Sequence, residues 1–308
     1  MPEFDLLVIG DLNPDLVLTD ADVVPEFGQK EKLVADAALE MGGSSAICAV
    51  QAAKLGLRTV FVGKVGDDGF GHLMIGELSK NGVDTSLMIV DPSLKTGLTV
   101  NLNTGDDRAM LTYLGSINAL QPQDLPVQHL GRTRHVHVGS YFLQKSLRPG
   151  LAPFFRQARA QGVTTSLDPG WDSEEQWNGP LAVALAGVDV FLPNENELCA
   201  IAHLADPQAA LARLAAQVPI VAMKQGPAGA TARHGEEVAR CAPPPVQVVD
   251  AIGAGDSFDA GFLYGFLHNW PLAECVRLGC YCGAWSTRRS GGIAGQPSRA
   301  ELAEWFAF

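Results

Sequence analysis

The chain has 308 residues, 47% of them hydrophobic, which is enough apolar material for one large α/β domain or two ordinary domains. Its 34 Asp and Glu residues outnumber its 22 Lys and Arg residues, and the formal net charge of −12 argues against nucleic acid or an anionic membrane surface as the main partner. Because the N-terminus lacks the basic region and apolar run of a signal peptide, and no stretch of about 18 residues is uninterruptedly apolar, we expect a cytoplasmic protein.

Apolar runs that are typical of strands alternate with helical patterns from the N-terminus onward. A strand is expected at 4–10, an Ala-rich helix at 44–55, a strand at 59–63 and a helix at about 70–80. The same alternation resumes at residue 134, with strands at RHVHVGS, TTSLDPG, VDVFLPN and PIVAMKQG and helices between them. It predicts one continuous α/β domain over 1–308, with a doubly wound, mostly parallel sheet and helices on both faces.

Two segments break this alternation. Residues 16–40 and 97–114 are expected to form strands joined by turns, with TGDD at 104–107 as a hairpin turn and no helix between the strands. They predict a small second β-sheet that is discontinuous in sequence.

The six cysteines form no recognisable framework, since they are scattered and include no C-x-x-C pair. His135 and His137 share one face of an expected strand, but no third ligand is recognisable nearby, so we expect packing or hydrogen-bonded roles for both. Reduced thiols are expected at Cys48, Cys199, Cys241, Cys275, Cys280 and Cys282.

The stretch VVDAIGAGDSFDAGFLYG, at 248–265, places glycines, carboxylates and a helix start within a few positions. A Walker A loop does not explain it, because Val65 follows the chain's only Gly-Lys pair where Ser or Thr is required. A dinucleotide fingerprint is a weak match, because Phe258 stands at the third glycine position.

An anion hole remains as the physical interpretation of this stretch. Gly253, Ala254 and Gly255 are small enough for their N–H groups to converge on an oxygen anion, beside the positive end of a helix expected from about 256 to 268. Asp256 should stay ionised there and could take a proton from a hydroxyl, which indicates phosphoryl transfer to an alcohol. A tight turn with Asp256 as the helix N-cap explains the same residues.

Five stretches give the chain a family resemblance, and they include two separate signatures in the right order. DAIGAGDSFDAG resembles the C-terminal signature of the ribokinase family, also called the phosphofructokinase-B (PfkB) family of carbohydrate and nucleoside kinases. GGSSAICAVQAAKLG and GKVGDDGFG resemble its N-terminal signature, GDLNPDLV its first strand, and PNENE its metal motif. The resemblance spans essentially the whole chain and implies the family's doubly wound fold with a small β lid, here from 16–40 and 97–114.

The resemblance also implies roles for individual residues. Asp256 would be the catalytic base, and Gly253, Ala254 and Gly255 would form the anion hole for the transferred phosphoryl group. The side chains of Asn13 and Asp15 would hold hydroxyl groups of the sugar. Gly42 and Gly43 would let the backbone approach the sugar closely.

The implied cofactors are ATP and Mg²⁺, with K⁺ as a further candidate. Asn194 and Glu197 would support Mg²⁺ through waters, and their spacing puts both on one helix face, where they also suit an acid-rich, capped first turn. Asp250 would help to bind a monovalent cation. The nucleotide would be lined by Lys224, Gly226 and Gly229, with Gly291 near the adenine.

The expected activity is ATP-dependent phosphorylation of a sugar hydroxyl, specifically an exocyclic CH₂OH, under a lid whose apolar face could pair two subunits as a homodimer. A nucleoside kinase is the first alternative, with Tyr113 or Phe142 as candidates for an aromatic platform. A catalytically silent sugar- or nucleotide-binding regulator is the second, because Ala251 and Ile47 replace the family's usual Thr and Asn.

Overall fold

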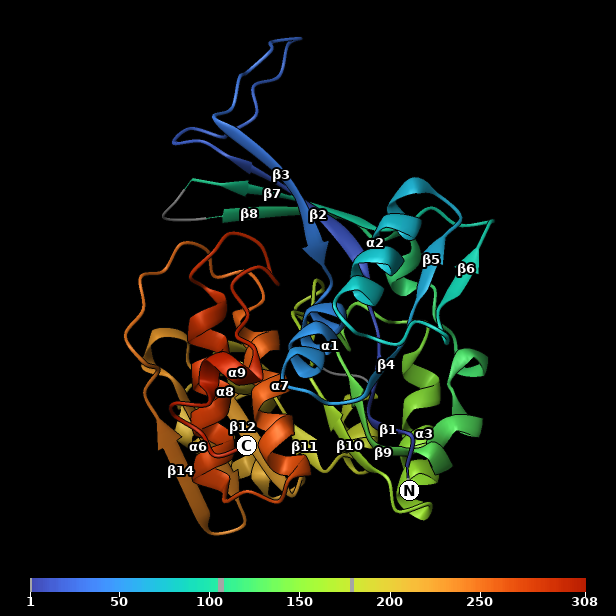
Figure 1. The fold of residues 1–308 in the computed structure, drawn as a ribbon, viewed down its shortest axis with the longest axis vertical. Coiled ribbons are helices and arrows are strands. Elements are labelled where there is room, and N and C mark those ends of the chain that lie inside the picture. Colours follow the sequence, from blue (N-terminus) through green and yellow to red (C-terminus); the bar gives the residue numbers. More distant parts are fainter. Residues whose placement is uncertain (1, 105–107, 178–179) are drawn as a thin grey trace.

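The computed structural model describes residues 2–104, 108–177 and 180–308. In these residues the main sheet has eight strands in the order β14-β13-β12-β11-β10-β9-β1-β4 (Figure 1). Neighbouring strands in the part β12-β11-β10-β9-β1-β4 pair in parallel. Strands β13 and β14 add an antiparallel edge next to β12. Their bounds are β1 Phe4–Ile9, β4 Thr59–Val62, β9 Thr133–Val138, β10 Thr164–Leu167, β11 Val190–Phe191, β12 Ile220–Lys224, β13 Ala230–His234 and β14 Glu237–Cys241.

Helices cover both faces of this sheet. Every residue of β1 is buried, as expected of a parallel strand covered on both sides. Leu6 and Val8 pack towards α1, α2, α7, α8 and α9, whereas Leu7 and Ile9 pack towards α3, α4, α5 and α6. This arrangement confirms the predicted doubly wound fold. The helices are α1 Ser44–Lys54, α2 Gly69–Lys80, α3 Arg148–Ala160, α4 Leu181–Leu185, α5 Glu195–Ala202, α6 Pro207–Ala215, α7 Ala254–Leu267, α8 Leu272–Ser286 and α9 Arg299–Leu302.

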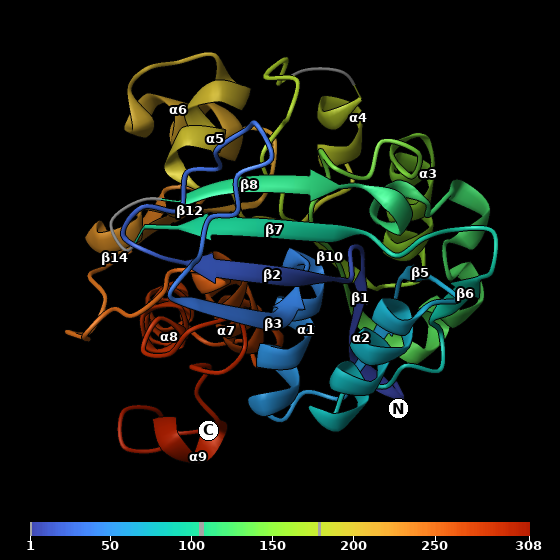
Figure 2. The same cartoon turned by 90° about the horizontal axis from the view of Figure 1, so that it is seen from above.

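A second sheet lies beyond the carboxyl ends of the parallel strands (Figures 1 and 2). Its strand order is β3-β2-β7-β8, and we call it the lid sheet. Its strands are β2 Asn13–Thr19, β3 Asp36–Gly42, β7 Leu98–Asn103 and β8 Arg108–Tyr113. Strand β2 begins three residues before the expected start at 16, and 20–35 form an irregular excursion instead of strands. Of the expected TGDD turn, 105–107 lie outside the described residues.

The two faces of the lid sheet differ in chemistry. Strand register places Leu16 beside Val100 and Val100 beside Leu111. The face of the sheet that carries these side chains is apolar throughout, and we call it the outer face. Asp15 and Asn101 lie on the opposite, inner face, which is turned towards the main body. The large apolar residues of the outer face are Leu16, Leu18, Leu39, Leu98, Val100, Leu102, Leu111 and Tyr113.

The remaining elements are short. A two-stranded sheet pairs β5 Lys64–Gly66 with β6 Ile89–Asp91, and 3₁₀ turns occur at Gly115–Asn118, Pro122–Asp124, Val127–Arg132 and Gly226–Ala228. No helix within the described ranges is long and apolar enough to cross a membrane. All six cysteines are free thiols, as expected.

We predict that Asp5→Asn lowers the free energy of unfolding by about 2 kcal/mol at pH 7, because two guanidinium groups would lose a charged acceptor. Asp5 begins β1 and accepts hydrogen bonds from Arg58 (2.9 Å) and Arg134 (3.0 Å). The hydrogen bond from Arg58 is the main reason why the pKa of Asp5 lies well below its usual range. The stabilisation is therefore complete above the unfolded-state pKa of about 4 and is lost as the pH falls further.

Urea unfolding at pH 7 and pH 3 measures this effect, and the difference between Asp5→Asn and the wild type should shrink at pH 3. Asp22→Asn is the control, since Asp22 is highly exposed and its ion pair with Lys32 (2.7 Å) should contribute little to stability at either pH. Equal losses at both pH values would contradict the assignment.

Candidate active site

The loop after β1 sets the position of helix α1. Asp11 accepts hydrogen bonds from the backbone N–H groups of Ser44 (3.0 Å) and Ser45 (3.1 Å) and from the Ser45 hydroxyl (2.6 Å). Gly43 precedes the helix with a φ of 87°, and a Cβ atom there would lie 2.7 Å from the carbonyl oxygen of Asp11. Gly43 therefore lets α1 begin directly against this loop. The sequence analysis did not single out Asp11, although its place after a buried strand was a usable signal.

The inner face of the lid sheet carries the residues expected to hold a sugar. Asn13 donates a hydrogen bond from Nδ2 to Oδ1 of Asp15 (3.1 Å), and a Cβ atom on Gly42 would overlap the Asp15 carboxylate. Burial raises the pKa of Asp15 to about 7, against the effect of the neighbouring Asn101 and Asn13 side chains. Asn101, on β7, was missed by the sequence analysis, although the alternation in LTVNLN marks it as sharing a face with other polar residues.

The anion-hole segment forms the start of helix α7. Gly253 is the N-cap residue with a φ of 72°, and a Cβ atom there would lie 2.8 Å from Cγ2 of Ile47. The helix begins at Ala254, two residues earlier than expected, so Asp256 belongs to its first turn and is not the N-cap. The N–H groups of such a first turn lack partners within the helix and are available to an anion.

The electrostatic state of Asp256 differs from the expectation. Burial raises its pKa to about 8, and the negative charge of Asp168 adds to the increase. The nearby Ser44 side chain opposes this shift only in part. This upward shift opposes the expectation that Asp256 stays ionised, because burial among carboxylates disfavours the charged form of the group.

Lys224 takes part in a buried ion cluster. Its Nζ donates to Oδ2 of Asp168 (2.6 Å) and to Oδ1 of Asp259 (3.0 Å). Lys224 ends β12, Asp168 follows β10, and Asp259 lies one turn after Asp256 on α7. Burial opposes ionisation of Lys224, but the carboxylate of Asp168 and then that of Asp259 outweigh it and raise its pKa. The sequence analysis assigned Lys224 to the nucleotide and overlooked both aspartates.

Asn194 and Glu197 form a reciprocal helix cap. Oδ1 of Asn194 accepts from the Glu197 N–H (2.9 Å), and Oε2 of Glu197 accepts from the Asn194 N–H (2.8 Å). Burial raises the pKa of Glu197 to about 7, and the Asp168 carboxylate adds to the increase. A cation would relieve this crowding of acidic groups, and hard oxygen donors suit Mg²⁺. Among the described residues, no group of three or more His, Cys, Asp or Glu side chains could hold a metal ion by itself. A Mg²⁺ site at Asn194 and Glu197, reached through waters, stays a prediction.

Asp250 connects two loops near the anion hole. Its Oδ1 accepts from the Ile252 N–H (2.9 Å), and its Oδ2 accepts from the Gly291 N–H (3.0 Å). A Cβ atom on Gly291 would lie 2.7 Å from the Glu40 carboxyl carbon, so this glycine lets its loop approach the lid sheet. A K⁺ role for Asp250 and an adenine contact for Gly291 stay predictions.

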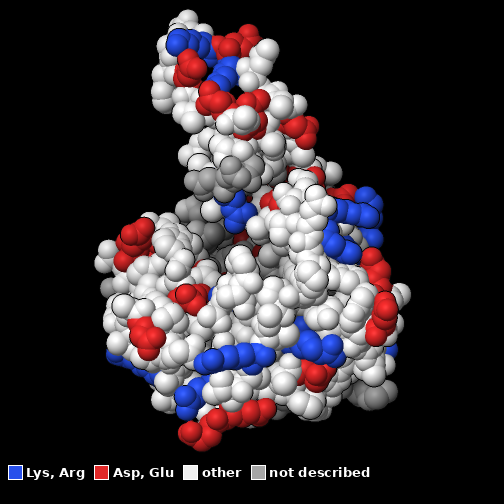
Figure 3. All heavy atoms as spheres, turned by 90° about the vertical axis from the view of Figure 1, so that its left-hand side faces the viewer, with Lys and Arg blue, Asp and Glu red and all other residues white. Residues whose placement is uncertain are grey.

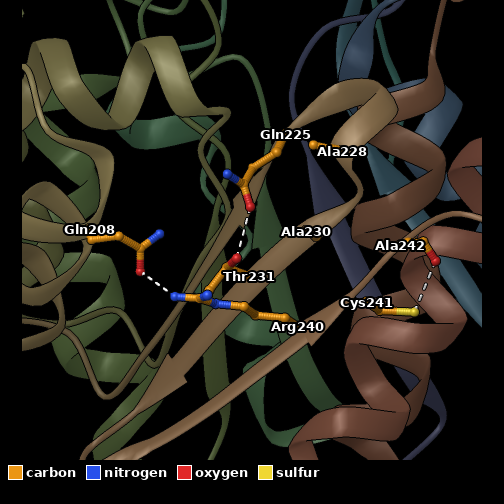
Figure 4. A pocket seen from close by; sticks show the side chains of 8 residues that line it. All are labelled: Gln208, Gln225, Ala228, Ala230, Thr231, Arg240, Cys241 and Ala242. Carbon is orange, nitrogen blue, oxygen red and sulfur yellow. Dashed lines mark hydrogen bonds between the residues drawn. The ribbon is translucent and has the colours of Figure 1, made fainter.

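The turn between β12 and β13 depends on two glycines, Gly226 and Gly229, which have φ angles of 54° and 90°. A Cβ atom on Gly229 would overlap the carbonyl oxygen of Cys241. A hollow of about 230 Å³ lies beside this turn. Figure 4 shows its lining side chains, among which Thr231 donates a hydrogen bond to Gln225 and Arg240 donates one to Gln208. Its lining residues are Gln208, Gln225, Ala228, Ala230, Thr231, Arg240, Cys241 and Ala242, none of which belongs to the Lys224 cluster. A nucleotide contact for the two glycines stays a prediction.

His135 and His137 form hydrogen bonds with the neighbouring strand β10, and the aromatic candidates Phe142 and Tyr113 do not face the expected sugar site. His135 contacts the hydroxyls of Thr164 (2.8 Å) and Ser166 (2.7 Å), and His137 contacts Ser166 (2.8 Å), which confirms the hydrogen-bonded role.

Phe142 is completely buried. Tyr113 lies on the outer face of the lid sheet, opposite to Asp15. Neither aromatic ring can stack on a base held beside Asp15.

The surface is hollowed between the lid sheet and the main body (Figure 3). The lid sheet, whose inner face carries Asp15, lies above α1 and α7 (Figure 1). In doubly wound sheets, ligands bind outside the carboxyl ends of the strands. The arrangement can thus hold a polar molecule between a carboxylate lid and an anion-binding helix terminus.

Comparisons with known proteins agree with this geometry. A fructokinase of Klebsiella pneumoniae is 33% identical over 278 residues, covering 85% of this chain and 90% of that protein. An uncharacterized sugar kinase of Archaeoglobus fulgidus is 28% identical and covers 79% of this chain and 97% of that protein. A structure of a putative ribokinase II from E. coli in complex with ATP and Mg²⁺ has a TM-score of 0.86 at 23% identity, covers 98% of each chain and supports the fold. The pfkB family carbohydrate kinase model matches residues 3–299, and the chain therefore belongs to the pfkB family of carbohydrate kinases.

Proposed function

We propose that this carbohydrate kinase transfers the γ-phosphoryl group of ATP to a sugar hydroxyl, specifically an exocyclic CH₂OH. The observation that carries the proposal is that Asp256 occupies the first turn of α7, next to the small residues Gly253, Ala254 and Gly255. A base and a set of backbone donors are then together where the hydroxyl meets the phosphoryl group. The resemblance of the chain to a named fructokinase supports a sugar as the acceptor.

The sugar would bind under the lid sheet, with the Asp15 carboxylate accepting hydrogen bonds from its hydroxyls and the Asn13 amide donating to them or accepting from them. Asp256 would take the hydroxyl proton on its carboxylate, and the first N–H groups of α7 would stabilise the charge on the transferred group. Asn194 and Glu197 would hold Mg²⁺ through waters. The bound metal would offset the charge of the phosphates.

A screen of sugars and nucleosides for ATP turnover tests the proposed function directly. Turnover with a hexose or pentose and none with nucleosides is expected, because Tyr113 and Phe142 supply no platform for a base. Preferred turnover of a nucleoside would overturn the sugar assignment, and binding without any turnover would favour a silent regulator.

We predict that Asp256→Asn lowers kcat by roughly 10²–10⁴-fold, because the amide cannot accept the hydroxyl proton. Mg·ATP and sugar should still bind, which calorimetry can measure. In the wild type, kcat/KM should rise with pH up to about 8, since the base must be ionised and its pKa is raised to about 8.

Asp206→Asn is the matched control, because Asp206 caps the first turn of α6 and should leave kcat unchanged. Removing the buried carboxyl group of Asp256 should not lower the melting temperature at pH 8. Near-normal turnover by Asp256→Asn would show that the mechanism lacks its base.

We predict that Asp15→Ala weakens sugar use far more than nucleotide binding, by on the order of 2–4 kcal/mol in kcat/KM for the sugar. Asp15 is 9% exposed, and its loss would leave the sugar hydroxyls without a charged acceptor. Asp36→Ala, which changes an exposed residue of the same sheet, should have little effect. Unchanged sugar kinetics in Asp15→Ala would refute the assignment.

We further propose that the lid sheet closes on the bound sugar and excludes water, which would limit wasteful ATP hydrolysis. The separate sheet and its polar inner face support this. Amide hydrogen exchange in 16–40 and 97–114 should slow when a verified sugar is added. Unchanged exchange in both segments would contradict closure.

We also propose that two subunits pair through the apolar outer face of the lid sheet. Leu111 is 61% exposed there, and a hollow of about 610 Å³ lies beside Leu39, Leu98 and Tyr113. Light scattering should give a dimer for the wild type and a monomer for Leu111→Arg. Met110→Arg changes the adjacent inner-face residue and should stay dimeric, whereas a monomeric wild type would exclude the pairing.

A further inference from the structure

Lys224 forms buried ion pairs with two aspartates, which a residue that only lines a nucleotide site does not require. Its Nζ lies 2.6 Å from Oδ2 of Asp168 and 3.0 Å and 3.1 Å from the two carboxylate oxygens of Asp259. The side chains of the lysine and the two aspartates are 11%, 8% and 1% exposed. Buried pairs of this kind keep a fixed geometry, because separating the charges inside the protein is costly.

The cluster connects three elements at the carboxyl edge of the main sheet. Lys224 is the last residue of β12, Asp168 directly follows β10, and Asp259 is on α7. Asp259 follows Asp256 by three positions, which places both on the same face of the helix. The ammonium therefore anchors α7, at Asp259 and one turn after the proposed base, to two strand ends.

The same ammonium is adjacent to the proposed anion hole. A Cβ atom on Gly255 would lie 3.6 Å from both Nζ and Cδ of Lys224. Gly255 therefore separates the lysine from the space in front of the helix terminus. The ammonium is paired with the carboxyl groups of Asp168 and Asp259, and at Asp256 the negative charge of Asp168 outweighs the positive charge of Lys224. Lys224 can therefore act on the helix start chiefly by fixing its position.

We propose that Lys224 is a positioning residue for phosphoryl transfer, which acts through Gly255 and Asp256 and not by contact with the nucleotide. Its ammonium links α7, at Asp259, to Asp168 after β10 and to its own strand β12, and this link fixes the position of the preceding turn, which carries Gly255 and Asp256. This inference rests on the proposed function, and it replaces the nucleotide-lining role that the sequence suggests for Lys224.

The test compares kcat with KM in variants that remove the charge. Lys224→Met keeps the length of the side chain, but it leaves two buried aspartates without their cation and can prevent folding. The double variant Lys224→Met/Asp259→Asn avoids this, because it also removes one carboxylate and introduces an amide that can donate to Asp168. Lys224→Arg keeps the charge and should recover part of the activity.

The expected result for the double variant is a fall in kcat of roughly 10–100-fold, smaller than the 10²–10³-fold loss typical of a donor in direct contact. KM for ATP and for the sugar, and the Kd of Mg·ATP by calorimetry, should stay within about threefold. Lys64→Met is the matched control, since the Lys64 side chain is as buried as that of Lys224, forms an ion pair with Asp124 (2.7 Å) and should affect stability without changing kcat.

Two outcomes would overturn the inference. A large increase in KM for ATP and in the Kd of Mg·ATP, with kcat unchanged, would make Lys224 a nucleotide contact. Unchanged kcat and KM would leave the cluster with a purely structural role. Failure of the proposed function is distinguishable from both, because the wild type itself would then transfer no phosphate to any sugar.

Discussion

The ammonium of Lys224 allows several acidic groups to share one edge of the sheet. Asp168 and Asp259 contact it directly, and it acts on Asp256 and Glu197 through its charge. Carboxylates buried together without a cation would protonate or destabilise the fold. The remaining compensation comes from the positive ends of helices, which is why Asp11 can lie at the start of α1. The acidic site is thus stable only because strands β10 and β12 end where α7 begins.

Small residues determine how closely these elements approach. Gly42 leaves room for the Asp15 carboxylate, and Gly253 lets α7 begin against Ile47. Ile47 stands where the family usually has Asn, and its side chain fills the contact with Gly253 by apolar packing. A site that collects anionic groups and phosphate needs such close backbone approach, because peptide N–H groups bring positive charge without a long side chain.

Much of the architecture followed from the sequence. The alternation of apolar strands and helical patterns predicted the doubly wound sheet, because burial on both faces makes parallel strands continuously apolar. The glycines and aspartate of GAGD indicated an anion-binding helix start, and the motif NENE indicated a capped first turn, which the reciprocal cap of Asn194 and Glu197 confirms. These features are local, so the residues that create them are neighbours in the chain.

Only the tertiary structure decided the electrostatics and the partners. Burial raises the pKa of Asp256 to about 8, and the negative charge of Asp168, which is distant in the sequence, adds to the increase. The partners of Lys224 likewise come from a different strand and a helix, and no spacing in the chain announces them. Tyr113 had no assignable side until the strand register placed it on the outer face, away from Asp15. Local patterns specify the elements, but a charge is set by every group that the fold brings near it, and this depends on contacts between distant segments.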